Sequence, residues 1–361
     1  MDPQATPALV IDAAVVYRNI ERLATYADEH DLDVRPHTKT HKSRQLGALQ
    51  ISAGAVGLTT AKVGEAELMA EVADDILVAY PAIDPVRVAR LAKLAKHCTV
   101  RVAVDSLAGA KRLADAANRA KATIGILVDL DVGMRRTGLQ TASETLKLAQ
   151  VIDATPGVRL DGLFCYPGHI GGAPDTQEAA LREVSNKLDQ TLRLWEDHGL
   201  QARIVSGGST PTAYQSHLVP EYTEIRPGTY VFNDMNCVRG GYCTLDDCAA
   251  RIICTVVSTS VPGQVVLDAG TKTLTSDRYA PDPGLGHGLV LEYPDAVINA
   301  LTEEHAQVDV RTCAKRPQVG DRVTVIPNHI CPCVNLQDTV WWRDEDGQLI
   351  EMPVDARGKL V

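Results

Sequence analysis

Residues 100–129, VRVAVDSLAGAKRLADAANRAKATIGILVD, decide the fold class of this chain. The stretch opens with a short apolar run, Val100–Val104, and closes with a second one, Ile124–Asp129. Between them, Leu107–Arg119 has the spacing of an amphipathic helix, with Ser106 as a plausible N-cap. The stretch therefore predicts a strand, a helix and a second strand in succession.

The same rhythm extends over the first two-thirds of the chain. Further strands are predicted at Asp33–Pro36, Val56–Thr60, Ile76–Ala79, Leu160–Cys165, Arg203–Ser206 and Glu224–Arg226. Further helices are predicted at Ala13–His30 (with Asp12 as N-cap), Lys62–Val72, Pro85–Lys96, Ala142–Ala154 and Glu178–His198. An α/β chain with strands nearly all separated by helices favours a closed TIM (β/α)8 barrel over an open doubly wound sheet.

From about Tyr242 the pattern changes to β-branched runs divided by Gly, Pro and Asp, which is typical of a β domain. Its strands are predicted at Ala250–Ser258, Gly263–Leu267, Leu289–Glu292, Gln307–Arg311, Arg322–Ile326 and Thr339–Arg343. We therefore expect a barrel over residues 1–235 and a C-terminal β domain over residues 236–361. We expect about the first ten residues to join the β domain and not the barrel.

Composition narrows the class of protein further. With 361 residues, 45% of them hydrophobic, the chain has enough apolar material for a large barrel and a second domain. A net charge of -10 and the lack of any basic run argue against nucleic acid and anionic membrane surfaces as partners. Met1-Asp2-Pro3-Gln4 lacks the features of a secretory signal, and nine scattered cysteines are interpreted as reduced thiols. We therefore expect a cytoplasmic protein.

The first predicted strand ends in Arg35-Pro36-His37-Thr38-Lys39-Thr40-His41-Lys42. Functional side chains of such barrels follow the C-terminal ends of strands. A lysine there forms a Schiff base with an aldehyde cofactor when its surroundings favour the neutral amine, as the cationic neighbours Arg35 and Lys42 would. The alternative is an exposed basic loop.

Two glycine-containing segments follow the seventh and eighth predicted strands, which is where barrels usually bind phosphate. They are Ser206-Gly207-Gly208-Ser209-Thr210-Pro211-Thr212 and Arg226-Pro227-Gly228-Thr229-Tyr230. Glycine lets backbone N–H groups approach a phosphate, and a helix N-terminus adds positive potential. Each segment alone could be an ordinary turn, but their joint position favours a phosphate site.

Two more segments are candidates for chemistry. Asp129–Gly138 follows the fifth strand and offers an arginine, Arg135 or Arg136, whose fork of donors suits a phenolate or carboxylate, although a charged turn would look the same. In Ile326-Pro327-Asn328-His329-Ile330-Cys331, the histidine and cysteine are two residues apart and would lie on one side of an extended chain. Two ligands indicate an open metal site completed by water or substrate. The alternative is a buried histidine with structural cysteines.

Taken together, these segments resemble the D-threonine aldolase and D-serine dehydratase family, which is related to the bacterial alanine racemases and is built on pyridoxal-phosphate fold type III. The resemblance covers almost the whole chain and is most specific in Arg35–Lys42 and Pro327–Cys331. Ala61–Glu67, Tyr166–His169 and residues 207–210 also take part in it.

The resemblance implies a role for particular residues. It implies pyridoxal 5'-phosphate on Lys39, Arg136 near the cofactor's phenolate oxygen, Tyr166 near the cofactor and His169 close to the substrate, with Lys39, Arg136 and His169 as the catalytic group. Phosphate contacts would fall on Gly207, Gly208, Ser209, Gly228, Thr229 and Tyr230. One divalent ion (zinc, manganese or magnesium) would be held by His329 and Cys331, and the relatives indicate a homodimer.

The implied activity is metal-assisted lysis of D-β-hydroxy-α-amino acids, a small-molecule substrate class. Retro-aldol cleavage to glycine and an aldehyde is favoured, with D-serine dehydratase-type elimination to a 2-oxo acid and ammonia as the alternative. The Ala61–Glu67 and Tyr166–His169 segments are aldolase-like, whereas a cysteine at position 331, where some aldolases carry aspartate, is dehydratase-like. A racemase and a non-catalytic pyridoxal-phosphate-binding protein are the alternatives of other classes.

Overall fold

A computed structural model of the chain describes residue 3 and residues 5–361. Met1, Asp2 and Gln4, from the segment considered above for a secretory signal, lie outside the described residues. The chain divides into two compact units. The barrel unit comprises Glu21–Lys39, Ser43–Gly228 and Gly358–Val361, and the β unit comprises Met1–Ile20, Thr40–Lys42 and Thr229–Arg357.

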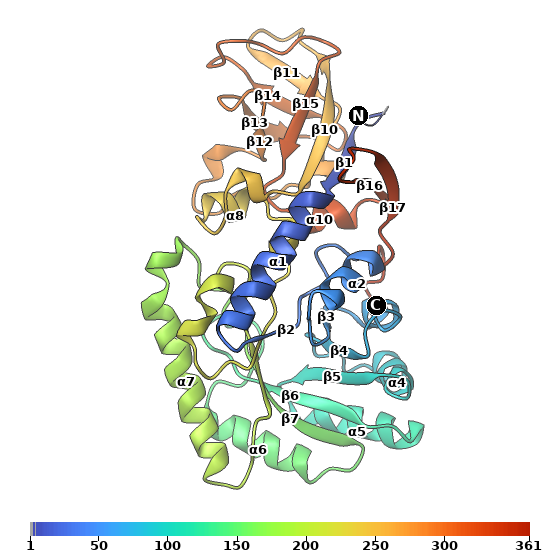
Figure 1. The fold of residues 1–361 in the computed structure, drawn as a ribbon, viewed down its shortest axis with the longest axis vertical. Coiled ribbons are helices and arrows are strands. Elements are labelled where there is room, and N and C mark those ends of the chain that lie inside the picture. Colours follow the sequence, from blue (N-terminus) through green and yellow to red (C-terminus); the bar gives the residue numbers. More distant parts are fainter. Residues whose placement is uncertain (1–2, 4) are drawn as a thin grey trace. The chain divides into compact units, whose positions relative to one another are not determined.

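The barrel unit contains an 8-stranded parallel sheet in the order β2-β9-β8-β7-β6-β5-β4-β3 (Figure 1). Its strands are β2 (Asp33–Val34), β3 (Leu58–Thr60), β4 (Asp75–Val78), β5 (Thr99–Val104), β6 (Ile124–Asp129), β7 (Val158–Phe164), β8 (Ile204–Gly207) and β9 (Glu224–Ile225). The edge strands also meet, because His37 forms a parallel bridge with Thr59 and the Thr38 N–H donates to the Thr59 carbonyl at 2.8 Å. The sheet is closed, so the predicted barrel is confirmed.

Helices follow most strands, and their starts agree with the capping chemistry of the sequence. They are α1 (Ala13–Glu29), α2 (Arg44–Ser52), α3 (Val63–Met69), α4 (Pro85–Leu94), α5 (Leu107–Ala120), α6 (Ala142–Asp153) and α7 (Glu178–Glu196). The Asp12 carboxylate accepts from the Val15 N–H at 3.2 Å, and the Ser106 hydroxyl accepts from the Gly109 N–H at 3.2 Å. The sequence pattern missed α2 because its buried face mixes Leu46 with a glycine and a glutamine and shows no apolar stripe.

The barrel core has an apolar layer and a charged layer. Leu77, Ala103, Leu127 and Phe164, from four neighbouring strands, form the apolar cluster. Charged residues earlier on the same strands pair with one another, Asp75 with Arg101 and Arg101 with Asp161. Asp75 and Arg101 lie two positions before Leu77 and Ala103, and Asp161 lies three positions before Phe164. Gly125 makes room for them, since a Cβ there would lie 2.2 Å from an Asp161 carboxylate oxygen. This cluster continues through Arg35 to Glu224.

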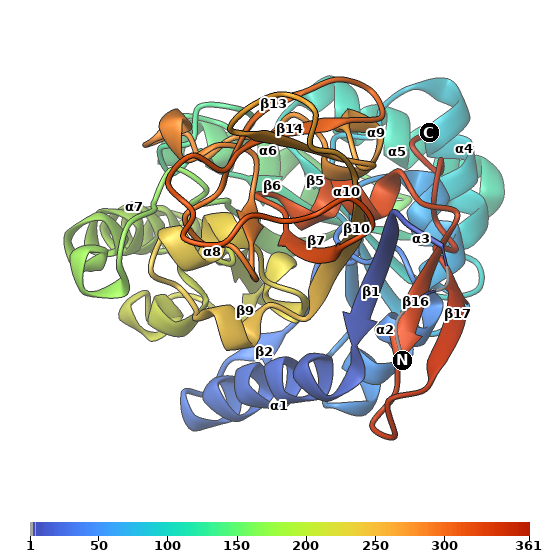
Figure 2. The same cartoon turned by 90° about the horizontal axis from the view of Figure 1, so that it is seen from above.

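The β unit contains a 9-stranded sheet in which β1 (Ala8–Asp12) lies antiparallel to β10 and parallel to β16 (Figure 2). Its other strands are β10 (Ala250–Ser258), β11 (Gln264–Leu267), β12 (Leu289–Val290), β13 (Val297–Leu301), β14 (Ala306–Asp309), β15 (Arg322–Ile326), β16 (Thr339–Arg343) and β17 (Leu349–Pro353). The six predicted strands are present, whereas β1, β13 and β17 were not predicted. β13 and β17 each keep half or more of their residues out of the core. In the described part of the chain, no helix is both long and apolar enough to span a membrane.

Candidate active site

The predicted barrel residues lie together at one rim. Lys39 follows β2, Arg136 follows β6, and Tyr166 and His169 follow β7. Gly207 ends β8, so Gly208 and Ser209 follow it directly, and Gly228 follows β9. Because all eight strands run in parallel around a closed barrel, their C-terminal ends form a single rim, which is where barrel enzymes bind their ligands.

Lys39 is anchored through its backbone while its amine is left available. The segment before it is tied to the rim by the His37 N–H, which donates to the Pro227 carbonyl at 3.0 Å. The Lys39 N–H itself points to the His37 imidazole at 3.3 Å. The half-buried side chain makes no hydrogen bond or ion pair with any residue that the structure describes. An amine held in this way fits a lysine that condenses with an aldehyde.

Arg136 and Tyr166, which follow the neighbouring strands β6 and β7, contact each other at the rim. The Arg136 guanidinium lies over the Tyr166 ring, 4.7 Å from its centroid. Arg135 instead has a left-handed backbone, with a φ of 54°, and its N–H donates to the Asp131 carboxylate at 2.9 Å. Of the two arginines, Arg136 therefore has the side chain that joins another predicted rim residue.

His169 packs against the loop that carries Arg136. A Cβ added at Gly133, whose φ is 129°, would lie 2.5 Å from the His169 ring, so this position requires glycine for two reasons. The exposed imidazole has no hydrogen-bond partner within the described part of the chain. The His169 imidazole is therefore not engaged by any side chain or backbone group of the described residues.

The two predicted phosphate loops are joined to each other. The Gly228 N–H donates to the Thr210 hydroxyl at 3.2 Å, and Ser209 is buried with its hydroxyl 3.0 Å from that of Thr212. Gly208 has a φ of 76°, a conformation that favours glycine. These glycines and hydroxyls, with the unpaired amine of Lys39, fit a phosphorylated aldehyde cofactor such as pyridoxal phosphate.

Two buried charges beneath the rim were not among the predicted site residues. Arg226 donates to the Ser206 hydroxyl at 2.6 Å and the Cys165 carbonyl at 2.7 Å, and it covers the Phe164 ring. Asp129 ends β6, and burial raises its pKa to about 6, against the opposing effects of the Thr137 hydrogen bond and of Arg226 and Arg136. Their position in the sequence could have revealed them, since both residues lie at the ends of strands. A buried charge at such a position is a candidate for a functional site.

In the β unit, His329 and Cys331 come together by a route that differs from the prediction. The extended-chain argument is wrong, because α10 (Ile330–Asn335) begins directly after His329. His329 is the extended N-cap, and Cys331 lies in the first turn of the helix. Their side chains nevertheless form a hydrogen bond with each other.

Hydrogen bonds from other segments surround this pair. The Cys331 sulfur lies 3.2 Å from the Thr40 hydroxyl and 3.6 Å from the Thr229 hydroxyl. Burial alone would raise the pKa of Cys331, but the hydrogen bond and charge of His329 lower it. Burial would lower the pKa of His329, but Cys331, Asp234 and Asp277 raise it to about 9. The hydrogen bond between the two side chains thus raises the pKa of the His329 imidazole and lowers that of the Cys331 thiol.

Asp277 and Asp234 support the pair and were missed by the sequence analysis. The Asp277 carboxylate lies 3.3 Å from His329 Nδ1, which leaves Nε2 for another partner. Asp234 is buried, and its carboxylate accepts from the Ile330 N–H at 3.1 Å. Neither aspartate lies within a recognisable ligand spacing, so only the fold reveals them.

The donor set fits a divalent ion held by imidazole nitrogen and thiolate sulfur, a combination that zinc accepts readily. Within the described residues, no group of three or more His, Cys, Asp or Glu side chains forms a metal cage. The residues that would hold such an ion are His329 and Cys331. Thr40, which contacts Cys331, directly follows Lys39 in the chain.

Comparison with known proteins places the chain. The alanine racemase N-terminal domain model matches residues 11–235, and the putative serine dehydratase domain model matches residues 249–342. The chain belongs to the family in which an alanine racemase N-terminal domain is followed by a serine dehydratase-like domain. It is accordingly a member of the pyridoxal-phosphate lyases of fold type III, as the sequence resemblance predicted.

Relatives of this family match along nearly their whole length. D-threonine aldolase from Arthrobacter sp. is 30% identical over 93% of this chain and 89% of its own. D-threo-3-hydroxyaspartate dehydratase from Delftia sp. is 30% identical over 90% of each chain. The crystal structure of D-threonine aldolase from Filomicrobium marinum superposes with a TM-score of 0.91 at 27% identity, over 99% of this chain and 97% of that one.

Proposed function

We propose that this enzyme cleaves D-β-hydroxy-α-amino acids by retro-aldol reaction to glycine and an aldehyde. The substrate class is supported by the relatives, which act on D-threonine and on hydroxyaspartate according to their names. The observation that carries the aldolase assignment is His169, an unpaired imidazole at the barrel rim beside the Arg136 loop. Retro-aldol cleavage needs a base for the β-hydroxyl proton, and His169 would serve as that base.

The other rim residues hold the cofactor and the charge. Lys39 would carry pyridoxal phosphate, which when bound supplies a sink for the electrons released at the substrate Cα. The Gly207–Ser209 and Gly228 loops, together with Thr229 and Tyr230, would bind the phosphate. Arg136, fixed over Tyr166, would present its fork of donors to the phenolate oxygen of the cofactor.

We further propose that His329 and Cys331 bind one divalent ion, most suitably zinc, with manganese or magnesium as alternatives. Such an ion supplies a Lewis acid that lowers the pKa of the substrate hydroxyl. Asp277 would fix the His329 ring through Nδ1, an orienting role common among metal-bound histidines.

The dehydratase is the second candidate, and the His329–Cys331 pair is the observation that favours it. Structures of D-threo-3-hydroxyaspartate dehydratase, with a TM-score of 0.89, include a His-to-Ala mutant and, in metal-free form, a mutant with Ala in place of the Cys two residues later. This spacing is the same as that of His329 and Cys331. In elimination, the Lys39 amine would take the α-proton and the β-hydroxyl would leave, giving a 2-oxo acid and ammonia.

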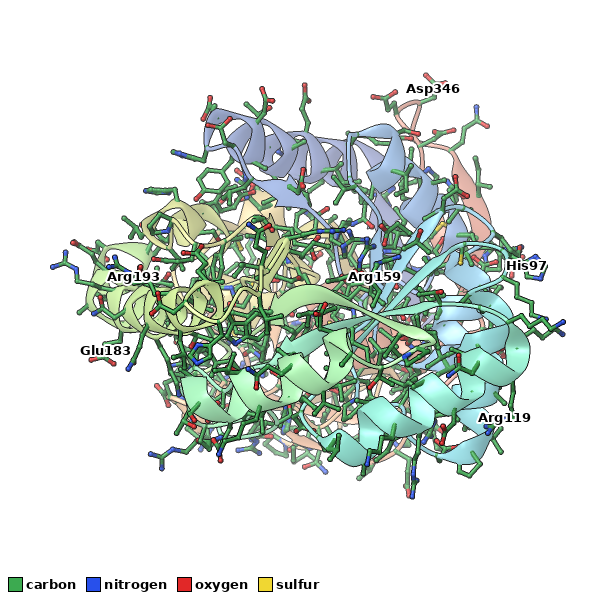
Figure 3. All side chains as sticks on the ribbon, turned by 90° about the horizontal axis from the view of Figure 1, so that it is seen from below. His97, Arg119, Arg159, Glu183, Arg193 and Asp346 are labelled. Carbon is green, nitrogen blue, oxygen red and sulfur yellow. The ribbon has the colours of Figure 1, made fainter. Side chains whose placement is uncertain are left out.

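Product analysis separates the two reactions. The holoenzyme is incubated with D-threonine and with D-serine, with and without chelator, and glycine, aldehyde and ammonia are measured. We expect glycine and acetaldehyde in equal amounts from D-threonine, and a loss of about 10²–10⁴-fold in His169→Ala, the usual contribution of a general base. His97→Ala, which removes an exposed histidine (Figure 3), is the matched control and should retain full activity. Ammonia with a 2-oxo acid would replace the aldolase by the dehydratase, and formation of L-allo-threonine, the Cα epimer of D-threonine, would indicate a racemase.

A further inference from the structure

Three cysteines of the β unit form a cluster that the proposed reaction does not use. Cys237 lies in α8 (Met235–Arg239), and Cys243 and Cys248 lie in the segment between α8 and β10. The Cys243 side chain is hydrogen bonded to both of the others. We call these three residues the thiol cluster. The tyrosine before Cys243 donates its N–H to the Cys237 carbonyl at 3.0 Å, so the two backbone segments that carry Cys237 and Cys243 are tied together.

The three thiols differ in their access to solvent. Cys243 is partly exposed, whereas Cys237 and Cys248 are 5% and 0% exposed. The hydrogen bond to Cys243, followed by burial, raises the pKa of both buried thiols, so these keep their protons. An oxidant arriving from solvent therefore meets Cys243 first.

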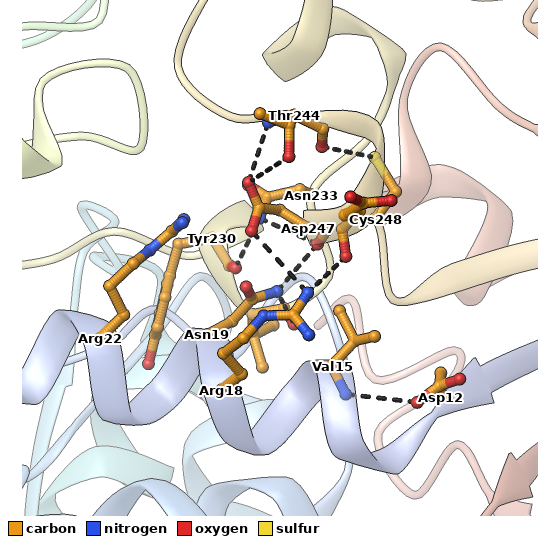
Figure 4. Close-up of polar contacts among 12 residues, drawn as sticks. Asp12, Val15, Arg18, Asn19, Arg22, Tyr230, Asn233, Thr244, Asp247 and Cys248 are labelled. Carbon is orange, nitrogen blue, oxygen red and sulfur yellow. Dashed lines mark hydrogen bonds and ion pairs between the residues drawn. The ribbon is translucent and has the colours of Figure 1, made fainter.

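The thiol cluster sits within a well-anchored segment. Figure 4 shows the Cys248 thiol directed at the Thr244 carbonyl, and the Asp247 carboxylate accepting from Thr244. The Asn19 side chain of α1 donates to the Asp247 carbonyl at 2.9 Å. These contacts fix the segment that carries Cys243 and Cys248. The fold therefore keeps the Cys243 side chain within hydrogen-bonding distance of its two neighbours.

Cys237 is connected to the His329–Cys331 segment through one buried carboxylate. Asp234 accepts from the Cys237 N–H at 3.0 Å and from the Cys237 thiol, and its other oxygen accepts from the Ile330 N–H. A second link is the Met235 N–H, which donates to the Pro327 carbonyl at 3.0 Å. A change at Cys237 therefore reaches the residue between His329 and Cys331 through two hydrogen bonds.

We propose that the thiol cluster is a peroxide-sensitive modification site, in which Cys243 and Cys237 form a reversible disulfide that loosens the His329–Cys331 segment. Hydrogen peroxide transfers one oxygen to the Cys243 sulfur as its O–O bond breaks. The products are a sulfenic acid on Cys243 and one water. The Asp234 carboxylate, which accepts a hydrogen bond from the Cys237 thiol, takes the thiol proton as the Cys237 sulfur attacks the Cys243 sulfur. The S–S bond forms, and the hydroxyl leaves with that proton as a second water. Two thiols are oxidised and one peroxide is reduced.

The disulfide would act on the metal-binding segment by removing a donor. Once Cys237 has lost its thiol proton, the buried Asp234 carboxylate has one hydrogen bond fewer, and Cys237 must move because a disulfide is shorter than a thiol–thiol hydrogen bond. Asp234 would then hold the Ile330 N–H less firmly. The disulfide itself does not depend on the proposed function, whereas its effect on metal binding does.

Peptide mapping tests the disulfide directly. The full chain is treated with limited hydrogen peroxide, free thiols are blocked with N-ethylmaleimide, and the digest is searched for cross-linked peptides. We expect a Cys237–Cys243 cross-link that dithiothreitol reverses, and at least about tenfold faster hydrogen exchange in the peptide over residues 326–335. Neither readout requires activity.

Matched variants complete the test. Cys243→Ser should prevent both the cross-link and the faster exchange after peroxide, whereas Cys313→Ser, which removes a partly exposed cysteine outside the thiol cluster, should change neither. A Cys243–Cys248 bond would overturn the assignment of Cys237. Irreversible oxidation of Cys243 without a cross-link, or exchange at residues 326–335 that ignores the cross-link, would overturn the proposal.

Discussion

Replacing Glu224 by glutamine removes one charge from the buried ion cluster of the barrel and leaves the shape of the side chain nearly unchanged. Glu224 is 2% exposed. One carboxylate oxygen accepts from Arg35 Nε at 2.8 Å, and the other accepts from the Ser206 hydroxyl at 2.5 Å. Glutamine has a single acceptor oxygen, so one of the two donors loses its partner.

The cost can be worked out from these contacts. A hydrogen bond to a charged group contributes about 1.5–3 kcal/mol, and leaving a buried charge without its partner costs about 3–5 kcal/mol. The Arg35 side chain, 3% exposed, keeps the Asp75 carboxylate at 2.7 Å, which places the variant near the lower end. We therefore expect Glu224→Gln to lower the free energy of unfolding of the barrel by about 3 kcal/mol.

Urea unfolding followed by Trp195 fluorescence measures this change in the barrel unit alone. Trp195 is fully buried there, and the other two tryptophans, Trp341 and Trp342 of the β unit, are replaced by Phe in all proteins compared. Glu183→Gln, an exposed position (Figure 3), is the matched control and should stay within about 0.5 kcal/mol. A midpoint for Glu224→Gln equal to that of the control, at unchanged slope, would refute the reasoning.

Three further predictions concern the site. Arg136→Lys keeps the charge but loses the fork of donors, so turnover should fall by about tenfold or more, and wild-type turnover would remove Arg136 from the site. Because the folded-state pKa of Asp129 is raised from 3.8 to about 6, its contribution to stability is full below pH 3.8 and is lost as the pH rises through about 6. Asp129→Asn should therefore gain up to about 3 kcal/mol over wild type in urea unfolding at about pH 7.5 and almost nothing at about pH 3.5, and a constant difference would contradict the shift. Chelation or His329→Ala should leave circular dichroism unchanged and lower turnover by orders of magnitude. Asp277→Asn should weaken zinc binding by about 10–100-fold. Full activity of the metal-free protein would contradict the metal-assisted reaction.

The barrel could be predicted because its evidence is local. Most of the strands are short apolar runs, and the long helices carry their own periodicity, some with a cap such as Ser106 or Asp12. Three strands escaped prediction. β1 is a short buried run directly before α1 and was not assigned as a strand. β13 and β17 expose many of their residues and depend on pairing partners for their stability. Hydrophobic periodicity carries no signal for such strands.

The site residues were predictable only where they belong to a sequence motif directly after a predicted strand. Lys39 and the glycine loops stand directly after strands, so their positions follow from the strand order. The helix that begins at Ile330 was not foreseen, because Pro332 and two cysteines give no helical period. Contacts between distant residues, such as Asp277 with His329 and Cys237 with Cys243, are set by tertiary structure and leave no spacing to read.

The most direct test of the account is to find the lysine that carries the cofactor. The holoenzyme is reduced with borohydride, digested, and the pyridoxyl-labelled peptide is sequenced by mass spectrometry. The account predicts the label on Lys39, with no label and no bound cofactor absorbance in Lys39→Ala. A label on Lys42 or Lys62 would contradict it.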